Sequence, residues 1–562
     1  MTTRLRSLLP WLAVLTVAAG VRLPTVTAGL PYMSYVDEGH VLHHVNYLLV
    51  HHTWEPDTYS YPSLPFYLVA GAALAWSPVY GLTHGHPLLA DLSPSPPEYY
   101  DILEPATLIV LGRLVILAFS LGIVVLTGLL VRRLAGPTAG LFAAWLAALV
   151  PALVMRSSVV NINPIVVFFV VAALFLADRA RTGEHPRRDA ILAGVMAGLA
   201  GATKYPAALV CLPVALAVLL APAPWLERLR RLLLAGAASI LTLLLAMPAL
   251  LLRTGNVLRS LHDMDSVYGS QAAGSYWDQA VHRAEWSLPT SHPELGIVFL
   301  LLTVAGLAVG LADRRWRWAV AGWLLFGIAT GLLVAPYQFR AFRNLLALVP
   351  LACAAVALLY AKLRETTARR LWLDLAAAVL PVLLFAPALY EYDAFQLALM
   401  DTRERAVRWL ARQVQPNDRV LVLRELAILP SRLDTLPAKV QVRVWERARD
   451  RVIERRDHYL VLGEVMRPDG KPKIRPMIVN WILANYQIVA QFGSVGTSHY
   501  PGFFRGNDQT IYVLKRKPSL PQPPLSPPPP RPDGREGAQS SPDRSLPLLP
   551  SGRGGGGEKR AG

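Results

Sequence analysis

The chain has 562 residues, of which 53% are hydrophobic, and a formal net charge of +17. Its apolar runs are about 15 to 25 residues long, the length that about 30 Å of hydrocarbon requires, so composition predicts a multi-pass membrane protein. The basic residues gather in short loops between the runs. Such charge is typical of membrane topology and does not indicate a nucleic-acid partner.

The first apolar run, Leu8 to Val21, follows Arg4 and Arg6. A signal peptide has the same features, and small residues follow at Thr27 to Gly29. We favour a retained anchor, because the charges of the later loops alternate across the membrane when this run is the first crossing. The N-terminus is then cytoplasmic.

The remaining apolar runs bring the predicted total to about eleven transmembrane helices. They are Ala106–Val131, Thr138–Met155, Pro164–Ala177, Ala190–Thr203, Ala207–Leu220, Leu232–Leu252, Leu295–Leu311, Ala319–Ala335, Leu345–Tyr360 and Leu371–Tyr390. Tyr61–Trp76, which two prolines interrupt, is predicted to be an interfacial or re-entrant helix at the outer surface. This topology leaves two large external loops, residues 22–105 and 253–294, and places everything after Tyr390 outside.

Residues 391–517 are more charged and predict a small extracytoplasmic α/β domain that follows the transmembrane region of residues 1–390. The expected helical or amphipathic segments are Arg403–Gln413, Val444–Glu454 and Ile478–Asn485, and the expected strands are Arg419–Leu423, Tyr459–Leu462, Gln487–Phe492 and Thr510–Leu514. Residues 518–562 are rich in Pro, Gly and Ser, and we expect a disordered tail there.

Asp37 and Glu38 stand directly after the first apolar run. Adjacent carboxylates at the mouth of a lipid-embedded bundle are costly, which makes them candidates for a reaction centre. A purely structural interpretation is that Asp37 caps a helix that begins near Glu38. Cys211 and Cys353 both lie inside apolar runs, which argues against a disulfide framework or a cysteine-based metal site.

Several short motifs resemble those of GT-C membrane glycosyltransferases. They are Val36-Asp37-Glu38, Glu55-Pro56-Asp57, Tyr61-Pro62-Ser63-Leu64-Pro65, Gly112-Arg113-Leu114, Thr203-Lys204-Tyr205, Arg343-Asn344-Leu345-Leu346 and Asp401-Thr402-Arg403. Their order over roughly residues 1 to 420 is similar to that of the protein O-mannosyltransferase and aminoarabinose transferase group (families 39 and 83). The resemblance implies a GT-C fold and transfer of a sugar from a polyprenyl-phosphate carrier, with inversion, to an acceptor on the outer face.

The charged residues of these motifs can each have a chemical role in such a transfer. Asp37 is the candidate base for the acceptor hydroxyl, and Glu38 would orient either the acceptor or Asp37. Lys204, Arg343 and Arg340, which the predicted topology places on the outer side, are candidates for holding the carrier phosphate. Snorkelling of these long side chains to the interface would explain their positions equally well.

Four further residues are candidate substrate contacts: Tyr61, Tyr205, Asn163 and Arg113. The tyrosines can stack on sugar rings, although an aromatic belt at the headgroup level predicts the same enrichment. Arg113 lies inside a span, so it needs a carboxylate partner or access to a polar cavity.

Metal dependence is not favoured. Asn163 stands where many relatives have a second acidic residue, and an amide is a weak ligand. Asp263 and Asp265 form a DxD-like string, and His40, His43 and His44 have helical spacing, but such patterns are common in polar loops. No cofactor is expected, with a divalent metal as the alternative.

Two other functions remain open from the sequence: a flippase or transporter of lipid-linked sugars, and a non-catalytic membrane scaffold. No internal repeat supports transport, and the unusual charges lie at the outer boundary. The excess of Arg over Lys hints at a bacterial source and hence a plasma-membrane location. The sugar, the carrier length and the acceptor cannot be read from these residues.

Overall fold

The computed structural model describes residues 3–33, 35–93, 103–268, 295–335, 342–398, 402–423, 426, 428, 430–443, 457–463, 482–493 and 510–517. Arg340, the expected amphipathic run Val444–Glu454 and the tail at 518–562 lie outside this set. So do most of the second large loop, at 269–294, and the first four residues of the expected helix Ile478–Asn485.

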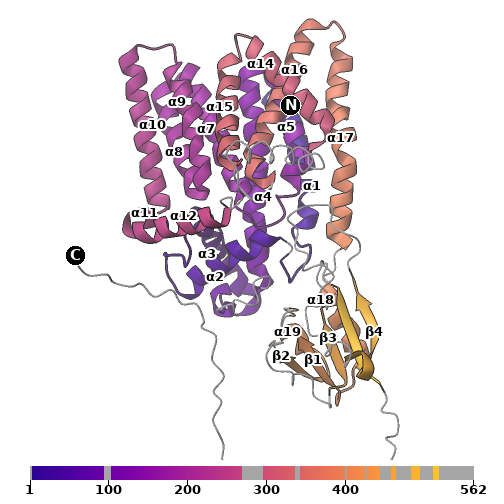
Figure 1. The fold of residues 1–562 in the computed structure, drawn as a ribbon. Coiled ribbons are helices and arrows are strands. Elements are labelled where there is room, and N and C mark those ends of the chain that lie inside the picture. Colours follow the sequence, from indigo (N-terminus) through magenta and orange to yellow (C-terminus); the bar gives the residue numbers. More distant parts are fainter. Residues whose placement is uncertain are drawn as a thin grey trace, which may run out of the picture. The chain divides into compact units, whose positions relative to one another are not determined.

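Long helices dominate the first 398 residues, and each predicted crossing corresponds to one of them (Figure 1). They are α1 (Thr3–Gly20), α4 (Ala106–Ala135), α5 (Pro137–Leu149), α7 (Asn163–Thr182), α8 (Pro186–Thr203), α9 (Cys211–Leu219), α10 (Trp225–Ala246), α14 (Ile297–Ala312), α15 (Arg317–Val334), α16 (Val349–Thr366) and α17 (Arg370–Ala398). The prediction of a polytopic helical protein is confirmed.

Eight helical segments in the described ranges are long and apolar enough to cross a membrane, and α5, α14 and the segment Tyr205–Leu219 are shorter apolar helices. One of the eight is α3 (Leu64–His84), which the sequence pattern predicted to lie at the surface and which continues past Trp76. α8 is not among them, because its first turn carries Arg187, Arg188 and Asp189.

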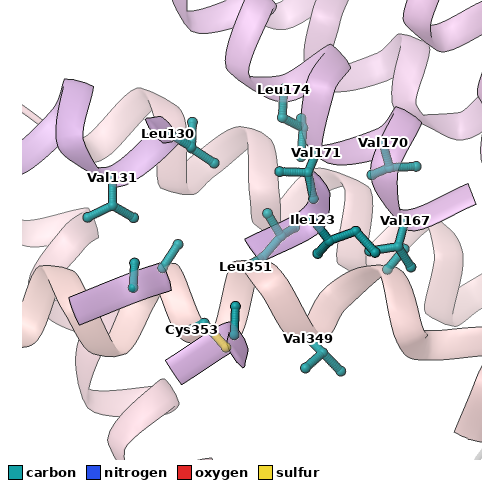
Figure 2. Packing of buried hydrophobic residues seen from close by; sticks show 14 of the residues in the cluster. Ile123, Leu130, Val131, Val167, Val170, Val171, Leu174, Val349, Leu351 and Cys353 are labelled. Atoms are coloured by element: carbon teal, nitrogen blue, oxygen red, sulfur yellow. The ribbon is translucent and has the colours of Figure 1, made fainter. Parts of the chain in front are cut away.

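The core of the bundle is built from α4, α5, α7 and α16. Figure 2 shows side chains of three of these helices together, including Ile123 of α4, Val170 of α7 and Leu351 of α16. Cys353 is completely buried there, so it acts as a small apolar side chain. Val14 and Ala18 of α1 belong to the same cluster, which fits the expectation that the first run is part of the bundle.

The helix pair α8 and α10 approaches closely because α8 carries glycines four residues apart. A Cβ at Gly194 would lie 2.1 Å from the carbonyl oxygen of Ala235, and one at Gly198 would lie 2.4 Å from that of Ser239. The backbones are therefore in direct contact. This contact fixes α8, whose last residue, Thr203, precedes the candidate phosphate ligand Lys204.

The loop between α1 and α4 contains η1 (Leu23–Thr25), α2 (Val36–Val50), α3 and η2 (Leu88–Asp91). Its buried side chains, such as Leu42 of α2 and Phe66 of α3, form a hydrophobic cluster separate from that of the bundle. A second connecting segment, α11 (Ala249–Leu252) with α12 (Thr254–Tyr268), follows α10. Both segments adjoin the candidate site.

The C-terminal region forms a five-stranded sheet of order β2-β1-β3-β5-β4. The strands are β1 (Arg419–Leu423), β2 (Lys439–Arg443), β3 (Tyr459–Leu462), β4 (Tyr486–Phe492) and β5 (Ile511–Arg516), with α18 (Thr402–Gln413) and α19 (Pro430–Leu433). β1 pairs in parallel with β2 and β3, whereas β5 pairs antiparallel with β3 and β4. The predicted α/β domain is confirmed, but β2 was not predicted, because the short sequence Lys-Val-Gln-Val-Arg has only two apolar residues.

Substitution of Gly194 by Ala tests the close contact of α8 and α10. We expect a loss of about 1 to 3 kcal/mol of stability, because the helices must separate to admit the methyl group. Gly236→Ala on α10 is the matched control, since a Cβ there meets nothing within 4 Å. Thermal unfolding in detergent measures both variants, and equal melting temperatures would argue against the contact.

Candidate active site

Asp37 contacts a cation that lies 306 residues away in the chain. One nitrogen, Nη1 of Arg343, donates to Asp37 Oδ1 at 2.8 Å and to Oδ2 at 2.9 Å. Arg343 belongs to η5 (Phe342–Leu348), which leads into α16. Helix α2 begins at Val36 with Tyr35 as its N-cap, and Asp37 and Glu38 lie in its first turn. The alternative interpretation, in which Asp37 caps this helix, is therefore wrong, although the helix does start near Glu38.

Glu38 points into the protein instead. Its Oε1 and Oε2 accept hydrogen bonds from Arg113 Nε and Nη2 at 2.8 and 2.9 Å, and both side chains are fully buried. Oε1 also accepts from the backbone N–H of Val160, and Arg113 Nη1 donates to the carbonyls of Val26 and Ala28. Arg113 thus has the carboxylate partner that the sequence required. The geometry favours a structural role for this pair over the expected acceptor-orienting and substrate-binding roles.

Lys204 follows α8 and is held by two amides. Its Nζ donates to Oδ1 of Asn344 at 2.9 Å and to Oδ1 of Asn163 at 3.2 Å. Asn163 begins α7, so α7, α8 and η5 meet at this ammonium group. Both amide oxygens are neutral, which leaves the charge of Lys204 uncompensated by its hydrogen-bond partners.

Asp37, Lys204 and Arg343 line one cavity of about 540 Å³. Tyr61, Asn163 and Tyr205 line it as well, so the structure brings six of the predicted site residues together. Glu38 and Arg113 do not line it, and Arg340 lies outside the described residues. The rest of the cavity wall is mostly apolar. It comprises Ile162, Pro206, Ala208, Leu209, Cys211, Leu212, Leu261, Met264 and Leu333, together with Ser60 and Asn344.

Burial shifts the pKa values of Asp37 and Lys204, two groups of this cavity that lie outside the spanning helices. Removal from water raises the pKa of the Asp37 carboxyl, against the opposing charges of Arg343, Lys204 and Arg156. Burial and the charge of Arg343 lower the pKa of Lys204 to about 8, and Asp37 opposes this shift. Asp37 is thus a stronger base than an ordinary carboxylate, and Lys204 titrates closer to neutrality than an ordinary lysine.

In the described part of the chain, no three His, Cys, Asp or Glu side chains gather. His44 Nδ1 lies 2.6 Å from Asp57 Oδ1, and the His40 ring packs edge-on against His44 and Tyr61. Burial and the charge of His44 lower the pKa of His40 to about 3, so His40 is neutral. Asp263 is exposed on α12, and the side chain of Asp265 is outside the described residues.

Tyr205 was also predicted to bind substrate, and its hydroxyl takes part in hydrogen bonds that connect two loops. Its hydroxyl donates to the carbonyl of Tyr59 at 3.0 Å, and the Tyr59 hydroxyl donates to Glu55 Oε1 at 2.7 Å. Arg253, directly before α12, donates to the same carboxylate at 2.7 Å. These bonds hold α12 beside the first loop, where Leu261 and Met264 complete the cavity wall.

Sequence reasoning missed Asn344, Arg156 and Tyr35. Asn344 follows Arg343 in a motif that the sequence singled out, but its role depends on Lys204, which is distant in the chain. Arg156 is buried, with its guanidinium 5.7 Å from the centre of the Phe342 ring, and its charge acts on Asp37. The argument that selected Lys204, a cation in a basic-poor connection, could have found Arg156.

Three comparisons bear on what the chain is similar to. Residues 108–251 match the family model described as dolichyl-phosphate-mannose-protein mannosyltransferase. No match is found among curated proteins.

Among solved structures, the chain is similar to ArnT from Cupriavidus metallidurans bound to undecaprenyl phosphate. The two sequences are 13% identical, the match covers 90% of this chain and 98% of that chain, and the TM-score is 0.52. The apo form of that protein gives a TM-score of 0.50 at 12% identity, with coverages of 90% and 97%. The oligosaccharyltransferase of Archaeoglobus fulgidus gives 0.47 at 11% identity, with coverages of 82% and 69%. The predicted resemblance to the GT-C superfamily is confirmed at the level of the fold.

Replacement of Glu38 by Gln tests whether this residue is structural. We expect a loss of about 3 to 5 kcal/mol, because Arg113 would keep a buried charge without its carboxylate. The double variant Glu38→Gln with Arg113→Met removes both charges and should recover part of the stability. The melting temperatures of the two variants measure these changes in stability. A Glu38→Gln protein as stable as wild type would show that the Glu38–Arg113 pair does not hold α2.

Proposed function

We propose that this chain, which shares its fold with the membrane protein ArnT, transfers a monosaccharide from a polyprenyl-phosphate carrier to an acceptor hydroxyl. The observation that carries the proposal is one cavity with a carboxylate, two cations and an extended apolar wall. A base, a phosphate site and a lipid-compatible surface are the three features that such a transfer requires.

Asp37 is the base of this reaction. An acceptor hydroxyl is a poor nucleophile, and a carboxylate within hydrogen-bond reach takes its proton as the attack on the anomeric carbon develops. Among the described residues that line the cavity, Asp37 is the one carboxylate, so no second acid is placed to form a covalent glycosyl intermediate. A single displacement follows, and the anomeric configuration is inverted.

Lys204 and Arg343 bind the carrier phosphate. Negative charge grows on the phosphate as its bond to the sugar breaks, and fixed cations in a site removed from water stabilise that charge. Asn344 joins them, because it holds Lys204 from the residue next to Arg343. Asn163, Tyr61 and Tyr205 surround the remaining polar volume, where they can contact sugar hydroxyls and rings.

The apolar wall accepts the first part of the polyprenyl chain. Leu209 and Leu212 come from the η4 and α9 segment, and Leu261 and Met264 come from α12. A volume of about 540 Å³ falls within the usual range for small-molecule sites. It suits a sugar phosphate with only the beginning of its lipid, so the rest of the carrier lies along the bundle surface. The undecaprenyl phosphate bound to ArnT supports a carrier of this class.

The proposal needs no metal ion. Among the described residues that line the cavity, the one carboxylate is already paired with Arg343, and Asn163 and Asn344 offer only amide oxygens, which are weaker ligands for hard cations. We expect the transfer rate to be unchanged by EDTA. A loss of activity that Mg²⁺, Mn²⁺ or Zn²⁺ restores would contradict this part of the proposal.

We further propose that the active site and the α/β domain lie outside the cytoplasm in the plasma membrane of a bacterium. The basic loops at the other ends of the helices support this orientation. They include Arg132 and Arg133 at the end of α4 and Arg179 and Arg181 at the end of α7. The acceptor is then an extracytoplasmic protein, lipid or glycan.

The role of Asp37 is tested by incubating the purified protein with a panel of radiolabelled polyprenyl-phosphate sugars. We expect Asp37→Asn to lower the rate of transfer about 10² to 10⁴-fold, since the amide cannot accept the proton. Asp91→Asn is the control, because Asp91 bonds to Tyr80 and does not line the cavity. Normal turnover by Asp37→Asn would refute the assignment and favour transport or a scaffold role.

The pH dependence of transfer should have two limbs. Lys204 is protonated below a pKa of about 8, so kcat/KM for the donor should fall as pH rises through about 8. Asp37 is ionised only above its raised pKa, so activity should also fall toward acid, starting at higher pH than for an ordinary aspartate. In Lys204→Arg the alkaline limb should disappear, and an alkaline limb that persists unchanged would exclude Lys204 as its origin.

A further inference from the structure

Arg343 lies where it can contact both the proposed base, Asp37, and the carrier phosphate. A single nitrogen of its guanidinium, Nη1, contacts both oxygens of Asp37. The guanidinium also hydrogen-bonds to the Tyr35 side chain. A guanidinium carries five N–H donors in a planar fork, so the donors beyond those that Asp37 and Tyr35 use can take a second anion. Asp37 and Arg343 both line the cavity, and Asn344, the next residue, holds Lys204. A phosphate bound by Lys204 therefore lies within the space that Arg343 can reach.

The charges of the two ends change in opposite directions during transfer. The proton of the acceptor hydroxyl passes to Asp37, which becomes neutral, while the acceptor oxygen forms its bond to the anomeric carbon. The bond between that carbon and the phosphate oxygen breaks, and its electron pair remains on the carrier phosphate. One negative charge thus disappears beside Arg343 as another appears at the phosphate.

We propose that Arg343 transfers its interaction from Asp37 to the departing carrier phosphate, so that one guanidinium couples proton abstraction to leaving-group departure. This inference rests on the proposed function and adds a mechanism to it. In a site with little water, an unpaired charge is costly, and a cation that follows the migrating negative charge avoids leaving either anion unpaired. A flexible arginine can make this move with its backbone fixed in η5.

The ligand-free state already shows one half of the exchange. Arg343 is engaged with Asp37, whereas Lys204 is held only by the neutral oxygens of Asn163 and Asn344. Lys204 then makes the first contact with an incoming phosphate. Asp37 retains Arg343 until its own negative charge is lost. The carboxylate and the phosphate consequently compete for the same guanidinium.

This competition predicts that removal of the carboxylate strengthens phosphate binding. The experiment measures the Kd of undecaprenyl phosphate, which carries no sugar and cannot react, for the full-length protein in nanodiscs at constant pH and ionic strength. We expect Asp37→Asn to bind about tenfold more tightly than wild type and Arg343→Gln to bind more weakly. In the double variant, the gain from Asp37→Asn should vanish.

The double variant separates the exchange from simple electrostatics. If Asp37→Asn tightens binding equally with and without Arg343, the gain comes from loss of a nearby negative charge and the exchange is wrong. Unchanged or weaker binding by Asp37→Asn also overturns it. Absence of binding to wild type overturns the proposed function together with the exchange, whereas normal binding that does not depend on Asp37 overturns the exchange alone. Asp91→Asn, distant from the cavity, should bind as wild type does.

Discussion

The buried ion pair between Glu38 and Arg113 is the interaction on which the site depends. It joins the first turn of α2 to α4 near the start of that helix, and the same two side chains also bind the backbone at Val26, Ala28 and Val160. Successive residues on a helix point about 100° apart, so fixing Glu38 toward the protein directs Asp37 elsewhere. Two adjacent acids with similar chemistry therefore have different tasks, because only one of them faces the cavity.

The second requirement is that distant segments reach one place. Asp37 comes from the loop after α1, Lys204 from the end of α8, and Arg343 from the segment that precedes α16. The ion pair of Glu38 orients Asp37, whereas contact between helix backbones positions Lys204. For Lys204, the glycines of α8 allow its helix to touch α10 directly. The chemistry of the site is thus held by packing within the bundle, which tolerates many substitutions of the exposed lipid-facing residues.

Much of this arrangement could be predicted from the sequence. The apolar runs predicted the bundle helices, since hydrocarbon thickness constrains their length, and strand-like or short apolar patterns predicted four of the five described strands. Lys204 and Arg343 were found because cations on the basic-poor side of a membrane protein are unusual, and Asp37 because adjacent carboxylates at the mouth of a lipid-embedded bundle are costly. Their convergence on one cavity agrees with that argument, although their roles in binding and catalysis stay predictions.

Other features depend on contacts that a sequence does not display. The division of labour between Asp37 and Glu38 follows from the partner of Glu38, 75 residues away. Arg113 was expected to need either a carboxylate partner or access to a polar cavity, and nothing in its own neighbourhood in the chain decided between the two or identified the carboxylate. The alternative of a helix cap at Asp37 does not hold, because α2 begins one residue before Asp37 and the carboxylate pairs with Arg343, 306 residues away. Strand β2 was missed because its alternating sequence is short and contains only two apolar residues.

The two amides around Lys204 have a consequence for turnover. An ammonium group bound to neutral oxygens can exchange one of them for an anion without abandoning a carboxylate inside the protein. When the spent carrier leaves, Asn163 and Asn344 remain in place to receive the ammonium again. Entry and exit are therefore nearly symmetric events at this end of the cavity, and the resting state can be restored without a large rearrangement of the helices.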